Sequence, residues 1–255
     1  MAKYEPLRFH FHATGYALSA HFHRPVDVPI PAQAALALPI EGGHAHSGVE
    51  KFNIPRLVSF HSAHTHLSGS WQDEDTATTS VTVVVEGLKI LDFLSIDRMV
   101  TRLTSQYNMK QKNSESHIIA VGSHFQGLRL GGFEVKVTLR HDLLLKSKTF
   151  ADLKNNVKND EKSGRIVIAG DEVLLCSLVG KIETDLADLP GVEVEGHTIR
   201  IPHFGQIALA EVFAGRGIRT LTMLRFELGS PDGGGGSGGS GTGNGQPPGG
   251  GGGGK

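Results

Sequence analysis

The sequence predicts an all-β protein, mainly an antiparallel β-sandwich with one short helix and a glycine-rich C-terminal tail. Apolar and polar residues alternate over short segments, for example from Phe133 to Arg140 and from Leu224 to Leu228. Alternation of this kind is typical of strands that bury one face, and such strands are usually antiparallel. The chain has 255 residues, of which 38% are hydrophobic, so it is long enough to bury a substantial core.

The first strand pattern lies at residues 9–23, FHFHATGYALSAHFH. A two-residue turn at Thr14-Gly15 would place Phe11 opposite Leu18 and would collect every apolar residue of the segment on one side. We therefore expect a hairpin here. Its polar, solvent-facing side would carry four histidines: His10, His12, His21 and His23.

The next segment contains four prolines between positions 25 and 39, and proline lacks the N–H that a central strand needs. We therefore expect this segment to cross from one edge to another and not to supply a central strand. Strands follow near residues 56–60 and 80–85. Three similar stretches then predict recurring strand–turn–strand units: residues 87–93 (GLKILDF), 127–133 (GLRLGGF) and 196–204 (GHTIRIPHF).

One segment, residues 149–160, has a helical pattern. Thr149 can cap its start and Asp152 stands three residues later, which is the spacing of a capping box. Period-two patterns resume after it, and strands are expected at residues 166–169, 173–179, 192–194, 199–201, 207–213 and 218–228.

The segment from residue 229 to residue 255 is dominated by glycine. It offers almost no side chains whose burial could offset the entropy of ordering the backbone, so the sequence predicts a flexible tail. Residues 1–228 would form the folded β-sandwich domain, either as one unit or as two fused halves of about 1–145 and 146–228.

Composition removes several classes of function. Lys plus Arg (25) nearly balances Asp plus Glu (26), so no strong positive field favours nucleic acid as a partner. No run of about 18 apolar residues occurs, so no membrane span is expected, and the first residues do not form an export signal. The single Cys176 cannot form an internal disulfide and stands in an apolar run, which is typical of a buried, unreactive thiol.

Five segments resemble a known family: residues 14–20 (TGYALSA), 94–101 (LSIDRMVT), 125–128 (FQGL), 189–196 (LPGVEVEG) and 207–211 (IALAE). In their order they look like the choice-of-anchor P family of bacterial surface proteins, over most of residues 13–228. The resemblance implies an exported, β-rich structural or adhesive protein and brings no active site with it. Its surface or extracellular location contrasts with the cytoplasmic location that the missing export signal would imply.

Histidine is the only residue with metal-binding chemistry that is present in excess, and nine of the 14 histidines lie in the first 66 positions. A His-x-His pair on a strand points both imidazoles the same way, which is how many β-rich metal sites obtain two ligands. The candidate ligands for a transition metal such as zinc are His44, His46, His61, His64 and His66. The competing interpretation, which we favour, is that these histidines lie on the polar face of a sheet and bind no cofactor.

The sequence contains no nucleophile elbow and no phosphate-binding loop, and no catalytic residues are expected. We therefore favour a non-enzymatic structural or surface protein that acts through self-association or binding, as a homo-oligomer or larger assembly. The alternative is a His-ligated metal-binding enzyme with a cupin-like fold.

Overall fold

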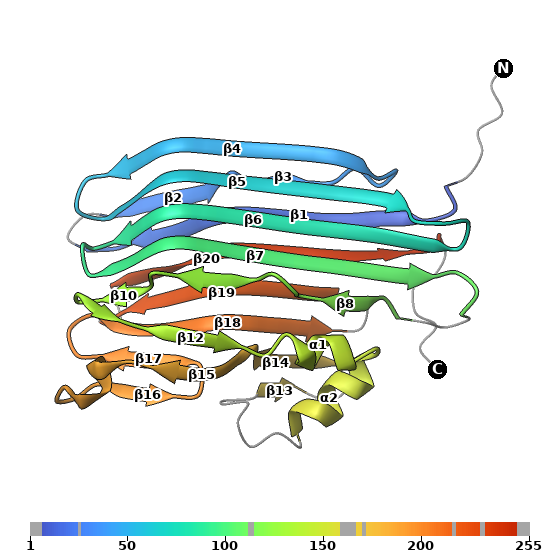
Figure 1. The fold of residues 1–255 in the computed structure, drawn as a ribbon. Helices are drawn as coiled ribbons and strands as arrows, with labels where there is room; N and C mark the ends of the chain where they lie inside the picture. The colour runs from blue at the N-terminus through green and yellow to red at the C-terminus, as the bar shows by residue number, and fades with distance from the viewer. Residues whose placement is uncertain are drawn as a thin grey trace.

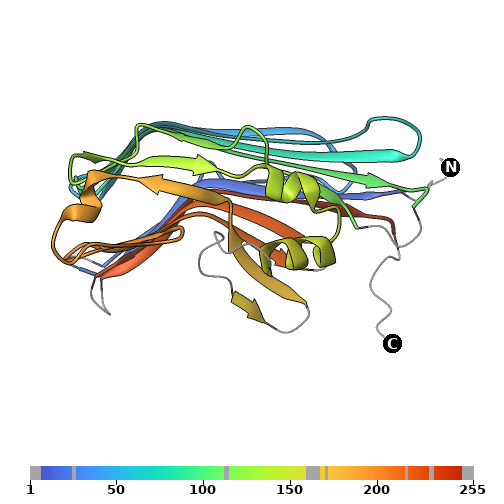
Figure 2. The ribbon, with the colours of Figure 1, turned by 60° about the horizontal axis from the view of Figure 1, so that its bottom comes forward.

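The computed structural model describes residues 7–24, 27–111, 115–158, 167–169, 172–215, 218–229 and 233–248. These residues form two large antiparallel sheets that pack face to face, which confirms the prediction of an all-β sandwich. Figure 2 shows the two layers one above the other. Each sheet ends in edge strands, so the described residues form an open sandwich and no closed barrel.

The first sheet, called sheet A, has ten strands. Its path runs through β13 (Val167–Ala169), β14 (Val173–Ser177), β18 (Gly205–Gly215), β19 (Ile218–Leu228), β20 (Gly234–Gln246), β1 (His10–Phe22) and β2 (Val28–Gln33). Three short strands lie off this path: β3 (Leu36–Ala37), β16 (Glu193–Glu195) and β17 (Thr198–Ile201). The proline-containing β2 lies at an edge of this sheet, so the segment does not supply a central strand, as predicted.

The second sheet, called sheet B, has eight strands and forms the front layer of Figure 1. Its path runs through β11 (Phe133–Glu134), β10 (Arg129–Leu130), β7 (Leu94–Asn108), β6 (Thr76–Ile90), β5 (Val58–Trp71) and β4 (Gly43–Ile54), while β8 (His117–Ile119) and β9 (His124–Gln126) also pair with β7. The turns within residues 87–93, 127–133 and 196–204 all join antiparallel strands, so the recurring hairpins are confirmed.

The remaining elements cover one end and one side of the sandwich. A small two-stranded sheet is formed by β12 (Lys136–Leu139) and β15 (Val179–Glu183). The helices are α1 (Asp142–Lys146), α2 (Phe150–Lys158) and the 3-10 turn η1 (Asp185–Asp188). The capping box predicted for α2 is present: the Asp152 amide donates to Thr149 Oγ1 (3.1 Å) and the Thr149 amide donates to Asp152 Oδ2 (3.0 Å). Neither helix among the described residues is long and apolar enough to cross a membrane.

The glycine-rich segment is a central strand, not a flexible tail. Strand β20 lies between β19 and β1 and pairs with both over most of its length. The prediction of flexibility is therefore wrong for residues 234–246, while residues 230–232 and 249–255 fall outside the described part. Hydrogen bonds to two neighbouring strands order this backbone without help from large side chains of its own.

The absence of side chains at the inward-facing positions of β20 lets sheet B approach closely. A Cβ placed on Gly241 would lie 2.7 Å from Val81 Cγ1, and one placed on Gly239 would lie 3.0 Å from Met99 Cε. Gly239 also has a φ of +59°, which side chains disfavour. Its carbonyl accepts a hydrogen bond from Thr101 Oγ1 of the facing sheet at 2.6 Å. Side chains of sheet B thus occupy the space beside Gly239 and Gly241 that side chains on β20 would otherwise fill.

A line of irregularities crosses sheet A at the middle of its long strands. On β1, the successive residues Ala17 and Leu18 both face the core. The regular pairing between strands is interrupted at Ala17 and at its neighbours across the sheet, which are Gly239 on β20, Met223 on β19 and Ala210 on β18. We call this row of positions the kink line. On one side of it the odd-numbered residues of β1 face the core, and on the other side the even-numbered residues do. Sheet B has an equivalent kink line through Lys51, His61, Gly87 and Asp97.

The kink line explains why the predicted hairpin at residues 9–23 is wrong. Strand β1 is one continuous strand, and Thr14 and Gly15 pair with Thr242 and Gly241 of β20. Because the core-facing residues change from odd-numbered to even-numbered at Ala17, the apolar residues on both sides of it lie on one face, as they also would if a turn joined two strands. The four histidines of this segment still lie outside the core, as the hairpin predicted.

Candidate functional site

The main concentration of histidines lies on the outer face of sheet B, over β4 and β5. His46 is directly opposite His66 in the ladder, and Gly48 is opposite His64. Because residues two apart on a strand share a face, three imidazoles meet here. The ring centroids are 4.4 Å apart for His46 and His66, and 5.8 Å apart for His46 and His64. We call His46, His64 and His66 the imidazole cluster.

The surroundings of the imidazole cluster are polar. His64 Nε2 lies 3.3 Å from Glu50 Oε1 on β4. Burial and the two neighbouring imidazoles lower the pKa of His66 below its ordinary value, which favours the neutral ring. The cluster borders a hollow lined by His44, His46, His66, Ser68, Ser80 and Thr82.

The structure thus brings together part of the predicted metal-ligand set. His46, His64 and His66 form the cluster, and His44 lies at the same hollow. His61 stands apart at the kink line, where its ring lies against Gly87. Within the cluster the rings of His64 and His66 are 6.5 Å apart, and the three rings do not bring their nitrogens within the span that a single ion requires.

Strand β4 is the free edge of sheet B, and Figure 1 shows it at the top margin of the front layer. Within the described residues it pairs with β5 on one side only. Its outward residues are exposed, and its inward residues are only half-buried. Val49, Phe52 and Ile54 pack against the core without being fully covered. A row of unpaired backbone groups beside half-covered apolar side chains can accept another strand.

A second group of possible ligands lies on sheet A, where β1 turns towards β2. His21 Nε2 is 2.6 Å from Asp27 Oδ1, and His23 Nδ1 is 3.4 Å from the same oxygen. All three side chains are exposed. Sequence reasoning placed His21 and His23 on the polar face and gave them no ligand role, and it missed Asp27 entirely. The signal that could have found the group is a His-x-His pair followed four residues later by an aspartate.

A buried ionic network joins β18, β19 and the turn before β17, and sequence reasoning did not find it either. Arg225 donates to both carboxylate oxygens of Glu211, at 2.6 and 2.9 Å, and His197 Nε2 lies 3.3 Å from Glu211 Oε1. Burial alone would raise the pKa of Glu211, but the hydrogen bonds from Arg225 and His197 outweigh it and lower the pKa to about 2. The network ties β18 and β19 to the turn before β17.

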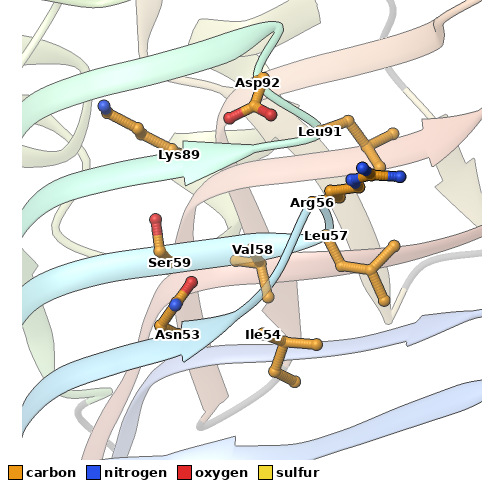
Figure 3. A pocket seen from close by; sticks show the side chains of 9 residues that line it. All are labelled: Asn53, Ile54, Arg56, Leu57, Val58, Ser59, Lys89, Leu91 and Asp92. Atoms are coloured by element: carbon orange, nitrogen blue, oxygen red, sulfur yellow. The ribbon is translucent and has the colours of Figure 1, made fainter.

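The turns at one end of sheet B enclose a further small pocket, drawn in Figure 3. Its walls come from the β4–β5 and β6–β7 turns, where Arg56, Leu91 and Asp92 have positive φ angles. Polar and apolar side chains both line the pocket (Figure 3): Asn53, Arg56, Ser59, Lys89 and Asp92 are polar or charged, and Ile54, Leu57, Val58 and Leu91 are apolar. Ser59 lies opposite Lys89 in the ladder between β5 and β6.

Cys176 is fully buried, as predicted. Burial raises the pKa of its thiol to about 12, so the reactive thiolate is scarcely populated at neutral pH.

Comparison with known proteins gives a family but no function. A family model described as a domain of unknown function, DUF8256, matches residues 9–168. No curated protein and no solved structure matches the chain. The matched region spans β1 to β13 and therefore includes all of sheet B, with the imidazole cluster and the free edge. Since it covers more than half of the sequence, the chain belongs to the DUF8256 family.

Proposed function

We propose that this protein is a non-enzymatic structural or surface protein that acts by self-association, and that two copies pair through the free edge of β4. The observation that carries this proposal is the free edge itself: twelve residues of strand with one side unpaired among the described residues and with half-covered apolar side chains. The resemblance to the choice-of-anchor P family supports the same structural role.

Strand β4 is complementary to itself in one register. If two copies pair antiparallel about a two-fold axis through Ser47, His44 of one copy lies opposite Glu50 of the other, and Ala45 lies opposite Val49. The first pair is an imidazole facing a carboxylate on the outer side. The second brings half-buried apolar side chains together on the core side. Lys51, with a φ of +54°, ends the ladder at the kink line.

Charge reversal tests both the pairing and its register. Glu50→Lys removes two symmetry-related cross-strand pairs, each contributing about 0.2–1 kcal/mol, so the dimer should weaken by roughly 2- to 30-fold. Adding His44→Glu restores an opposite-charge pair at the same position, so the double variant should regain the association. Sedimentation equilibrium near neutral pH measures both effects.

The matched control is Glu195→Lys, which makes the same charge change on exposed β16 of the other sheet. It should leave the association constant unchanged. A wild-type protein that remains monomeric at all concentrations would refute self-association. A dimer that Glu50→Lys weakens but His44→Glu does not rescue would refute the register through Ser47.

A further inference from the structure

We propose that His21, His23 and Asp27 bind one divalent transition-metal ion of the zinc type. The site is separate from the β4 edge and does not depend on the proposed self-association. It also differs from the set of histidines that the sequence singled out, because none of those five residues takes part.

The ligand atoms already lie close together. One ring nitrogen of each histidine and one carboxylate oxygen all fall within 4.8 Å of one another, and among the described residues no other trio of His, Cys, Asp or Glu does so. In a tetrahedral zinc site with bonds near 2.1 Å, neighbouring ligand atoms are about 3.4 Å apart. His23 Nδ1 and Asp27 Oδ1 have this separation, at 3.4 Å. His21 Nε2 and Asp27 Oδ1, now 2.6 Å apart, need to separate by only a small side-chain rotation.

The backbone holds the three residues in place. His21 and His23 are two apart on one face, with ring centroids 4.1 Å apart. Asp27 directly precedes Val28, which pairs with Phe22, and the next pair joins His21 to Pro29. The β1–β2 ladder therefore holds the residues on both sides of the turn that joins the two strands. Binding of the ion then costs little additional conformational entropy.

The donor set fits a borderline divalent ion. Two neutral imidazoles and a carboxylate are ligands that suit zinc, and three protein ligands leave a fourth position for water. The hydrogen bond with His21 lowers the pKa of Asp27, so this carboxyl is ionised at neutral pH. An ion at this position replaces that hydrogen bond by two metal–ligand bonds and ties the edge strand β2 to β1.

The exposure of the ligands limits what the ion does. The side chains of His21, His23 and Asp27 are 48%, 44% and 73% exposed, so water reaches the site freely. Next to His21, a shallow hollow runs over the glycine strand towards Arg225 and Glu227. An open site of this kind fits a structural clamp on the sheet edge.

Titration of untagged, metal-free full-length protein with Zn²⁺ alone tests the proposal. Calorimetry at neutral pH should show one equivalent per chain, and Co²⁺ should give the visible absorption of a four-coordinate site. His21→Gln with His23→Gln should abolish this binding, and Asp27→Asn should weaken it by at least about tenfold.

The matched control changes two histidines of the other group, His46→Gln with His66→Gln, and should leave the stoichiometry at one. Since all the altered side chains are exposed, each variant should unfold at the wild-type temperature in EDTA, and only proteins with an intact site should be stabilised by Zn²⁺. Absence of binding, or binding that survives loss of His21 and His23, would overturn the assignment. Loss of binding in the control would move the site to the imidazole cluster.

Discussion

The packing of β20 can be tested with a single methyl group. Gly236→Ala adds a Cβ that would lie 2.6 Å from Ala20 Cβ, 2.6 Å from the Ser19 carbonyl oxygen and 2.8 Å from Phe226 Cζ. Favourable contacts between carbon atoms begin at about 3.5 Å, so neighbouring backbone must move by several tenths of an ångström. Overpacking of this size costs about 1–3 kcal/mol, which for a domain of this length lowers Tm by about 2–12 °C.

Gly243→Ala is the matched control on the same strand. The nearest atoms to its added Cβ are Leu103 Cδ2 at 3.6 Å and Val81 Cγ2 at 3.7 Å, which are ordinary contacts. This variant should be neutral or more stable by about 0.4–1 kcal/mol, because alanine restricts the unfolded chain. Both Tm values are measured by calorimetry of the full-length chain. If Gly236→Ala and Gly243→Ala have the same Tm as the wild type, β20 is not packed between β1 and β19 and the reasoning fails.

Two further predictions concern buried groups. The pKa of Glu211 is lowered from its ordinary 4.5 to about 2. The ionised carboxylate therefore contributes its full stabilisation to the folded state at pH values above 4.5, and this contribution is lost as the pH falls from 4.5 towards 2. Urea unfolding should show a loss of about 2–3 kcal/mol over that window, and Glu211→Gln should remove this part of the acid sensitivity; an equal loss in the variant would contradict the network. Cys176 should resist iodoacetamide at mildly alkaline pH in the native protein and react fully in denaturant, as mass spectrometry can measure, and rapid labelling of native protein would disprove its burial.

The strands with alternating side chains were predictable because burial of one face imposes a period of two. Strand β19, where Leu224 and Phe226 alternate with Arg225 and Glu227, is an example. The helix α2 was predictable because Thr149 and Asp152 satisfy its first amides. Strand β20 was not predicted because its core-facing residues are glycines, so the sequence lacks the alternation of apolar and polar residues that marks a strand. Its outward residues do alternate: Ser240, Thr242, Asn244 and Gln246 are separated by single glycines.

The candidate sites were predictable only in part. The His-x-His spacing correctly indicated that His64 and His66 share a face, but it could not reveal that His46 lies opposite His66, because strand pairing is a long-range property. The carboxylate at Asp27 belongs to the following strand connection, and its approach to His21 depends on the β1–β2 ladder. The Glu211 network depends likewise on the register between β18 and β19.

The position of β20 has a consequence for folding during synthesis. Its partner β1 begins at His10, which pairs with Gln246, so the earliest and latest strands of the described chain are neighbours. Contacts over so great a sequence separation slow folding, because the loop must close before the pairing can contribute stability. Sheet A therefore stays divided between β1 and β19 until the glycine strand has left the ribosome. During that interval the unpaired edges of β1 and β19 can bind chaperones or pair with strands of other chains.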